Sequence, residues 1–338
     1  ARLCVQGCSQ VAGVDYDQTH CSTLRSSSLR LLTAVAARFG LSLRRWDFAS
    51  AYLQGALEDG EVVYCLAPPG HATIGADGRP RICKVVKPIY GMAQAGRRWQ
   101  RALFPWLLEQ GFTQLHVDKC LFEKRRKRDD GSFEMLLIGC YVDDLACAYD
   151  TQDGDRLYQE FTEALEKRWE VEDEGEISDL LAIEFRTEDG SITLHQSTYI
   201  ERLIGEFGSD GSKPSAQGYT TPCDKMLAVH VAEALLAREH SEPPPDSLLR
   251  EYQSLVGALL YCAVQTRPDI AFAMGLLCRC MSCPTEALMA DARRVLRYLE
   301  LYKSLGLRYE ADQRELSGFS DSDWGTRHST TGYVFMFS

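Results

Sequence analysis

Three aspartates, Asp47, Asp143 and Asp144, have the residue type and the setting to bind divalent metal ions. If their strands are neighbours, the three carboxylates converge, and because like charges raise one another's pKa a compensating cation is expected. Hard oxygen ligands suit Mg²⁺, and two such ions about 3.5 to 4 Å apart stabilise an in-line phosphoryl transfer. The alternative is a solvated Asp-Asp turn, since Asp is an ordinary turn residue.

The apolar runs around these aspartates predict the strands that hold them. Asp47 lies near the end of a strand predicted from Leu41 to about Phe48. Met135–Cys140 and Leu145–Tyr149 are apolar runs of strand length, and Asp143 and Asp144 lie between them, where a hairpin turn is expected. The carboxylates would therefore gather at one end of a sheet.

The other predicted elements alternate helices with strands, which is typical of the α+β class. We expect a mixed antiparallel sheet with packed helices. Helices are predicted over 24–39, 94–110 and 153–169, with a short one after 195, and strands over 62–66, 81–86, 180–185 and 192–195.

Gly, Ser and Pro collect after residue 208, including Glu242-Pro243-Pro244-Pro245, and this composition predicts a linker over 208–248. The domain predictions are then 1–207 before the linker, a helical region over 249–304 and a β-rich end over 305–338. Within the helical region, helices are expected over 249–265, 268–281 and 284–302.

Composition indicates a globular chain. Its 338 residues suit about two domains, and 45% hydrophobic with 25% charged residues is ordinary usage. The longest apolar run, Leu255–Val264, is shorter than the roughly 18 residues of a membrane span, so no membrane partner is expected. The chain begins Ala1-Arg2-Leu3 without an initiator Met or a leader, which predicts an excerpt without a signal peptide.

Charge is distributed unevenly along the chain. The net charge of −11 argues against a nucleic-acid partner. Residues 79–128, however, hold 13 Lys and Arg against 3 Asp and Glu, whereas 129–190 hold 4 against 20. The basic segment could bind a phosphate backbone, or it could be a solvated face.

The thirteen cysteines are scattered through apolar runs, which favours a reducing compartment over a disulfide scaffold. Cys278, Cys280 and Cys283 form the tightest group, but no second pair or nearby His completes a zinc site. Helix packing is therefore the favoured role of that group.

Five motifs, taken in order, resemble one family. Together they resemble the reverse transcriptase of copia-type LTR retrotransposon Pol polyproteins, and Ala1–Val5 resembles the start of that family's fingers segment. No protease or integrase motif is present. The motifs are Trp46–Leu53, Tyr90–Trp99, Tyr141–Asp144, Thr266–Asp269, and Phe319–Trp324 with Ser329–Tyr333.

The resemblance implies a right-hand polymerase fold. Residues 1–207 would form the partial fingers and the palm, 208–248 the linker and the start of the thumb, and 249–304 the helical thumb or connection. Residues 305–338 would be a truncated start of an RNase H-like domain, a β hairpin. The fingers would lack their first residues, because the chain starts after the Lys that usually precedes Ala1-Arg2-Leu3 in this family.

By resemblance, Asp47, Asp143 and Asp144 would be the catalytic metal ligands, with the Phe48 carbonyl as an extra ligand. Two Mg²⁺ ions, or Mn²⁺, would activate the primer 3′-hydroxyl and neutralise the departing pyrophosphate. The implied partners are dNTPs and an RNA or DNA template with its primer, and the implied location is intracellular, in the cytoplasm, in virus-like particles or in the nucleus.

Three residues would contact the incoming nucleotide. Tyr52 corresponds to the family's steric gate against a ribose 2′-hydroxyl, although its residue type also suits a core aromatic. Gln94 corresponds to a glutamine that contacts the nucleotide, although alone it would be a polar residue at a helix N-terminus. Arg2 would contact the triphosphate.

Basic side chains in two segments could meet nucleic-acid phosphates. Arg97, Arg98 and Arg101 share one predicted helix and could bind phosphate or form a solvated face. Lys124, Arg125 and Arg126 lie on a predicted hairpin arm, where they could contact the template or keep the sheet edge soluble.

The chain departs from the family pattern in places. Ala182 replaces the usual Gly of a Leu-Gly-Ile-Glu run, which would crowd a strand. The loop between Trp324 and Ser329 is shorter than expected. Asp321 would be the first RNase H carboxylate, but the chain stops inside the second strand, so RNase H activity is predicted to be absent.

We therefore expect an RNA-directed DNA polymerase fragment of a retrotransposon. The alternative is an inactive relic that only binds nucleic acid. A metal-dependent nuclease would share the carboxylates but has no use for Tyr52 or Gln94.

Overall fold

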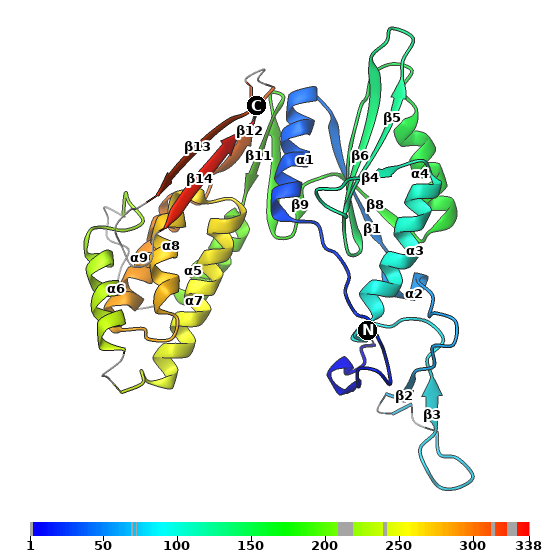
Figure 1. The fold of residues 1–338 in the computed structure, drawn as a ribbon, viewed down its shortest axis with the longest axis horizontal. Coiled ribbons are helices and arrows are strands. Elements are labelled where there is room, and N and C mark those ends of the chain that lie inside the picture. The colour runs from blue at the N-terminus through cyan, green and yellow to red at the C-terminus, as the bar shows by residue number, and fades with distance from the viewer. Residues whose placement is uncertain are drawn as a thin grey trace. The chain divides into compact units, whose positions relative to one another are not determined.

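The computed structural model describes residues 3–68, 70–71, 73–208, 219–238, 242–311, 315–322 and 330–337. The chain divides into two compact units (Figure 1). The first comprises Ala1–Ile177 with Gln313–Phe337, and the second comprises Ser178–Asp312. Both units combine helices with antiparallel sheets, so the predicted α+β class is confirmed.

A six-stranded antiparallel sheet forms the centre of the first unit (Figure 1). Strand β1 lies between β7 and β8, although both are distant from it in the sequence. The strands, in spatial order, are β4 (Thr113–Gln114), β5 (Leu121–Lys127), β6 (Phe133–Tyr141), β7 (Asp144–Tyr149), β1 (Ser42–Phe48) and β8 (Val171–Glu176).

Helices α1 (Ser26–Phe39) and α4 (Leu157–Arg168) cover opposite faces of this sheet (Figure 1). On one face, Trp46 Nε1 donates to the Tyr158 hydroxyl of α4 at 2.8 Å. On the other face, a side chain at Gly139 would meet Leu32 of α1. Since side chains alternate along a strand, Asp47 lies on the α1 face, next to Trp46 on the α4 face.

The remaining elements of the first unit are mostly short. Helix α1 closes at Gly40, whose φ of 65° is left-handed, the conformation that favours glycine after a helix. The remaining elements are the single turn of helix η1 (Gly7–Ser9), the helices α2 (Ala51–Gln54) and α3 (Ala95–Glu109), and the hairpins β2–β3 (Tyr64–Leu66 and Ile82–Lys84) and β13–β14 (Ser317–Ser322 and Thr331–Met336).

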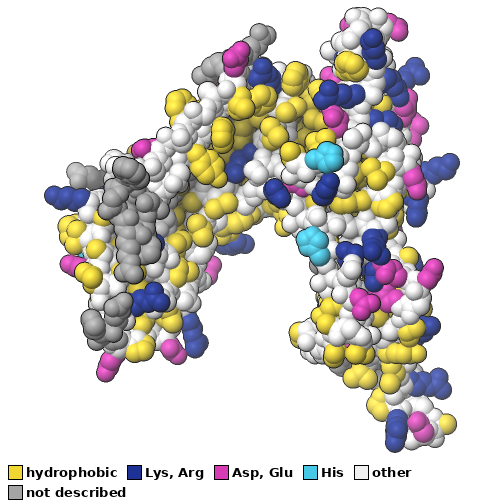
Figure 2. Space-filling model, viewed as in Figure 1, with side chains coloured by type: hydrophobic (Ala, Val, Ile, Leu, Met, Phe, Trp, Pro, Cys, Tyr) yellow, Lys and Arg dark blue, Asp and Glu magenta, His cyan; other side chains and the backbone are white. Residues whose placement is uncertain are grey.

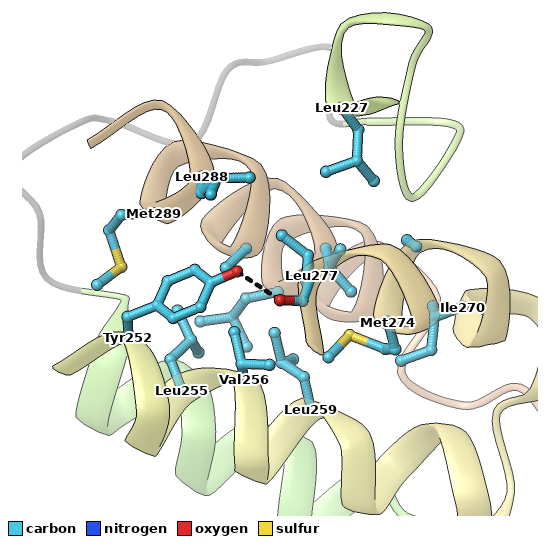
Figure 3. Close-up of a cluster of buried hydrophobic side chains, with 14 of the residues drawn as sticks. Leu227, Tyr252, Leu255, Val256, Leu259, Ile270, Met274, Leu277, Leu288 and Met289 are labelled. Carbon is cyan, nitrogen blue, oxygen red and sulfur yellow. Dashed lines mark hydrogen bonds between the residues drawn. The ribbon is translucent and has the colours of Figure 1, made fainter. Parts of the chain in front are cut away.

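The second unit packs helices around an apolar core beside a four-stranded sheet of order β12-β11-β10-β9. In that core Tyr252 is fully buried, and its hydroxyl donates to the Leu277 carbonyl at 2.9 Å (Figure 3). The elements are β9 (Asp179–Leu180), β10 (Ile183–Glu188), β11 (Ser191–His195), α5 (Ser197–Phe207), α6 (Met226–Ala237), α7 (Asp246–Gln265), η2 (Pro268–Ile270), α8 (Ala271–Leu277), η3 (Cys278–Cys280), α9 (Glu286–Leu301) and β12 (Gly306–Tyr309).

Three predicted elements differ from the observed ones. The strand predicted over 180–185 is two strands, β9 and β10, joined by a tight turn at Leu181–Ala182. The helix predicted over 153–169 begins only at Leu157. The helix predicted over 268–281 is broken into η2, α8 and η3. Periodicity alone detects neither a turn made of apolar residues nor a change of helix type.

The division at Ile177 comes earlier in the chain than the linker predicted over 208–248. Strand β11 pairs with β12, and Ile200 and Leu203 of α5 are buried in the helical core. These contacts join β9, β10, β11 and α5 to the helices that follow them, although no Pro- or Gly-rich segment separates them from the first unit.

Candidate active site

The strand register brings the three predicted aspartates together at one end of the six-stranded sheet. Asp47 of β1 lies directly opposite Asp144 of β7, and directly opposite residues of antiparallel strands share a face. The next amide, of Phe48, donates to the carbonyl of Asp143 at 2.9 Å. All three aspartates are partly exposed, so solvent and ions can reach them.

The turn that carries Asp143 is strained and is held from behind. Tyr141 and Asp144 pair across β6 and β7, which leaves a two-residue turn in which Val142 has a φ of 56°. That conformation favours glycine and is costly for a β-branched residue. Trp99 of α3 donates its Nε1 hydrogen to the Val142 carbonyl at 2.6 Å, which fixes the turn.

An aromatic cluster holds the Trp99 ring in place. Its ring centroid lies 4.7 Å from that of Phe48 and 5.2 Å from that of Trp169, both in edge-on geometry. Trp99 and Phe48 are almost completely buried. The apolar side of β1 therefore positions the turn that carries the second and third aspartates.

The site concentrates negative charge around Asp47. Burial, and then the neighbouring carboxylates of Asp143 and Asp144, raise the pKa of Asp47 above its ordinary value. Arg45 lowers it, and its Nε lies 2.9 Å from Oδ1 of Asp144. Arg45 precedes Asp47 by two positions on β1, so both side chains lie on the same face of the sheet.

These residues suit divalent ions chemically, with one rearrangement. Among the residues that the structure describes, no three Asp, Glu, His or Cys side chains stand close enough together to hold a metal ion. Asp144 is paired with Arg45 instead. The donors are nevertheless hard oxygens on adjacent strands with excess negative charge, which is the donor chemistry that Mg²⁺ and Mn²⁺ prefer.

Tyr52 lies on the short helix α2, which directly follows β1. The Gln54 side-chain amide donates to the carbonyls of Ala49 and Glu170, both at 2.8 Å, and so ties this helix to the start of β8. The Tyr52 ring lies 4.6 Å from that of Tyr90, centroid to centroid. Burial, and then the charge of Asp143, raise the pKa of the Tyr52 phenol above its ordinary value.

The arrangement can therefore bind cations and, through them, phosphates beside an aromatic wall. A family model described as "Reverse transcriptase (RNA-dependent DNA polymerase)" matches residues 1–223. The chain belongs to this reverse transcriptase family. The motifs that predicted the family from the sequence are thus confirmed at family level.

The curated relatives of this reverse transcriptase family member include transposon polyproteins. The chain is 30% identical over 347 residues to "Retrovirus-related Pol polyprotein from transposon TNT 1-94" of Nicotiana tabacum, covering 100% of this chain and 24% of the relative. It is 32% identical over 339 residues to the corresponding polyprotein from transposon RE1 of Arabidopsis thaliana, covering 99% of this chain and 21% of the relative. The chain thus spans about a quarter or less of these relatives.

A shorter relative comes from yeast. "Putative transposon Ty5-1 protein YCL074W" of Saccharomyces cerevisiae is 27% identical over 300 residues, covering 86% of this chain and 89% of the relative. No solved structure matches the chain significantly.

Gln94, which resemblance to reverse transcriptases assigns to the nucleotide, has no exposed surface in the structure. Its amide nitrogen donates to Oε1 of Glu61 at 2.8 Å and to the carbonyl of Asp15, and its oxygen accepts from Gln10. In this conformation Gln94 ties three loops together and offers no free group to a ligand.

The three arginines of α3 differ from the expected basic face. Arg98 is buried and bonds Glu61 through Nε at 2.8 Å, with Glu58 also against its guanidinium. Arg101 pairs with the same Glu58, and Arg97 bonds the His20 carbonyl and the side chain of Gln18. The sequence interpretation missed these partners because Glu58 and Glu61 lie in an irregular segment whose position periodicity does not predict.

The basic arm on β5 is exposed at Arg125 and Arg126, but it too carries acidic partners. Arg125 pairs with Glu123, and Arg126 with Glu160 of α4. The Lys124 ammonium lies 5.7 Å from the centroid of the Phe112 ring. Figure 2 shows Lys and Arg intermingled with Asp and Glu around this arm.

Other predicted site residues lie away from the aspartates or outside the described ranges. Arg2 is outside the described residues. Asp321 is exposed on β13. Cys280 and Cys283 are buried in the core of the second unit and Cys278 packs against it, in agreement with a packing role. In the described part of the chain, no helix is long and apolar enough to cross a membrane.

The sequence interpretation missed two residues of the site. Arg45 could have been found, because it lies two positions before Asp47 on one strand and so shares its face. Glu172 of β8 lies directly opposite Asp47 and adds a fourth carboxylate to that face. Its place depends on the pairing of β1 with β8, which no local pattern predicts.

Proposed function

We propose that this chain catalyses RNA-directed DNA synthesis, the transfer of a nucleotide from a dNTP to a primer 3′-hydroxyl on an RNA or DNA template. The single observation that carries the proposal is the register that sets Asp47 opposite Asp144, with Asp143 bonded to the next residue. In a chain of the reverse transcriptase family, this register supports Asp47, Asp143 and Asp144 as the metal ligands.

In this proposal the six-stranded sheet with α1 and α4 is the palm, and the β2–β3 region belongs to the partial fingers. The helices of the second unit form the thumb or connection, and the β13–β14 hairpin is the start of an RNase H-like domain. Asp47, Asp143, Asp144 and the Phe48 carbonyl would hold two Mg²⁺ or Mn²⁺ ions. When bound, such ions acidify the attacking hydroxyl and neutralise the leaving pyrophosphate.

The chain's own residues contribute positioning and charge. Trp99 holds the Val142 carbonyl, and through that turn it fixes the direction of Asp143. Arg45 balances the charge of Asp144 in the structure as it stands, and it must yield this partner before Asp144 can act as a ligand. Tyr52 lies on α2, directly after β1, and its ring would limit the space at the sugar of an incoming nucleotide.

Primer extension with the full chain tests this proposal. With an RNA template, a labelled DNA primer, dNTPs and Mg²⁺, we expect the primer to lengthen. Asp143→Asn should reduce the rate about 10²- to 10³-fold, the range seen when one group aimed at developing charge is lost. Asp153→Asn is the matched control, because Asp153 is exposed and lies in a loop away from the site, and it should leave the rate unchanged.

The same primer-extension assay distinguishes the alternative functions. Normal template binding without extension by the unaltered chain would contradict polymerase activity and indicate a relic that only binds nucleic acid. Shortening of the labelled primer in place of extension would indicate a nuclease. Incorporation of ribonucleotides by Tyr52→Ala, but not by the unaltered chain, would support the gate role of Tyr52.

A further inference from the structure

The β2–β3 hairpin of the first unit sets two cysteines directly opposite each other. Cys65 of β2 is the register partner of Cys83 of β3, between the pairs Tyr64–Lys84 and Leu66–Ile82. Directly opposite residues of an antiparallel pair point to the same face. The two thiols are therefore neighbours, although 17 residues separate them in the sequence.

The backbone spacing at this pair suits a disulfide. The Val85 amide donates to the Val63 carbonyl at 2.9 Å, which makes Val63–Val85 a hydrogen-bonded pair. Since the pair types alternate, Cys65–Cys83 is again of the hydrogen-bonded type, for which Cα atoms are about 5.5 Å apart. Disulfides span Cα separations of about 4.4 to 6.8 Å, so this Cα spacing lies within their range. The Cβ atoms of a hydrogen-bonded pair are wider apart than in a disulfide, so the two strands must close slightly when the bond forms.

Accessibility distinguishes this pair from the cysteines of the core. Cys83 is exposed and Cys65 is partly exposed, whereas Cys120, Cys140 and Cys147 are buried. Burial raises the pKa of all three buried thiols, and a buried thiol is a poor nucleophile. Because Cys83 is the more exposed of the two, it is the thiol that an external reagent meets first.

A bond at this position would stabilise a small and otherwise weakly supported element. Val63 and Val85, which adjoin β2 and β3, belong to a small apolar core with Met92 and Ala95, and Cys65 packs against that core. The rest of the hairpin exposes apolar side chains, which Figure 2 shows gathered in this region. An isolated two-stranded hairpin is marginally stable, so a covalent link changes its opening strongly.

We propose that Cys65 and Cys83 are a redox modification site that forms a reversible intramolecular disulfide with a low-molecular-weight disulfide such as oxidised glutathione. The Cys83 thiolate attacks one sulfur of that disulfide, and one glutathione thiolate leaves. The Cys65 thiol loses its proton and attacks the Cys83 sulfur of the mixed disulfide, and the second glutathione leaves. Two protein thiols are oxidised, and one glutathione disulfide is reduced to two thiols.

The test treats the full chain with buffers of graded ratios of reduced to oxidised glutathione, quenches it with acid and alkylates the free thiols. We expect an oxidised species that carries two fewer alkyl groups than the reduced chain, and after digestion a peptide pair linked through Cys65 and Cys83. Proteolytic cleavage within 67–81 should slow severalfold in that species, and reduction should restore the original rate.

Cys65→Ser and Cys83→Ser should each abolish the linked species, and Cys8→Ser, which removes another exposed cysteine, should leave it unchanged. The mapping of the unaltered chain does not depend on how these variants fold. Two outcomes would overturn the proposal: Cys83 carrying only bound glutathione at every ratio, or a linked peptide that joins other cysteines. The bond is independent of polymerase activity, so failure of either proposal leaves the other standing.

Discussion

At the scale of single residues, Asp47 shows a conflict between stability and function. Its pKa is raised, so the folded state binds a proton at Asp47 more tightly than the unfolded state does. The contribution of this proton to stability is complete below the unfolded pKa and is lost as pH rises toward the folded pKa. Near neutral pH, without metal, the ionised Asp47 therefore opposes folding.

We predict that Asp47→Asn stabilises the metal-free chain at neutral pH by roughly 0.5 kcal/mol, because it removes one of two like charges directly opposite across strands. The same substitution should abolish primer extension, since a neutral amide is a poorer ligand for a hard cation. Denaturant unfolding at pH 7 and at pH 3 measures the effect, and the stabilisation should shrink at pH 3. Equal stabilisation at both pH values would contradict the charge argument.

The second residue-scale prediction concerns Trp99. In Trp99→Phe the Val142 carbonyl loses its donor while most of the aromatic packing remains, so stability should fall by about 1 to 2 kcal/mol. Extension should slow about tenfold, equivalent to roughly 1.4 kcal/mol in the barrier, because Asp143 is held less firmly. Template affinity should be unchanged.

Trp106→Phe is the matched control, because Trp106 lies on the same helix and packs against Trp169 but touches no part of the turn. Equal loss of extension in both variants would mean that general packing, and not the bond to Val142, positions the turn.

The sequence predicts the strand that ends near Asp47 and the hairpin that carries Asp143 and Asp144, because both are local patterns. Their convergence also depends on the pairing of β1 with β7, which the sequence analysis could only assume. The sequence does not reveal the partners of Gln94 and Arg98, because both bond Glu61, an acidic residue in a segment without periodicity. A polar residue near the start of a helix has the same local pattern whether it faces a ligand or a loop.

At the scale of elements, the helix α3 illustrates this point. Arg98→Met should destabilise the fold by about 3 kcal/mol, because it leaves the half-enclosed carboxylate of Glu61 without its cation. Arg101→Gln should cost less than 1 kcal/mol, since Arg101 is largely exposed. Chemical denaturation measures both losses of stability. If both substitutions cost less than about 1 kcal/mol, the result would support the prediction that Arg98 belongs to a phosphate-binding face.

The turn between β9 and β10 could not be predicted from the local sequence. Leu181 and Ala182 both have positive φ, of 56° and 53°, yet neither residue is a turn former. The Tyr261 hydroxyl of α7 bonds the Leu181 carbonyl, so a tertiary contact supports a conformation that the local sequence does not favour. Where the sequence predicted that Ala182 would crowd a strand, the structure shows a strained backbone conformation at this residue.

We predict that Ala182→Gly stabilises the chain by about 0.5 to 1 kcal/mol, since glycine adopts positive φ without the penalty of a side chain. Ala146→Gly, in the centre of β7, is the control and should destabilise, because there glycine only adds flexibility to the unfolded chain and removes packing. Thermal unfolding of both variants checks the prediction, and destabilisation by Ala182→Gly would show that its strain is negligible.

At the scale of the whole molecule, composition and pairing place the domain boundary differently. Pro- and Gly-rich sequence predicts the boundary after residue 207, whereas strand pairing places it at Ile177. Composition reports where the backbone lacks regular structure, but a unit is defined by which residues bury one another. The pairing of β11 with β12 joins segments more than 100 residues apart, and no local pattern encodes that pairing.

The two boundaries make different predictions for isolated fragments. Residues 178–312 retain the β9–β12 sheet and every residue of the helical core, so this fragment should unfold cooperatively by itself. Residues 208–312 lose the partners of β12 together with Ile200 and Leu203 of that core, and they should lack a cooperative transition or unfold at a much lower denaturant concentration. Circular dichroism during urea unfolding of both fragments decides between the boundaries, since equal cooperativity would mean that β9, β10, β11 and α5 add nothing to the stability of the helices.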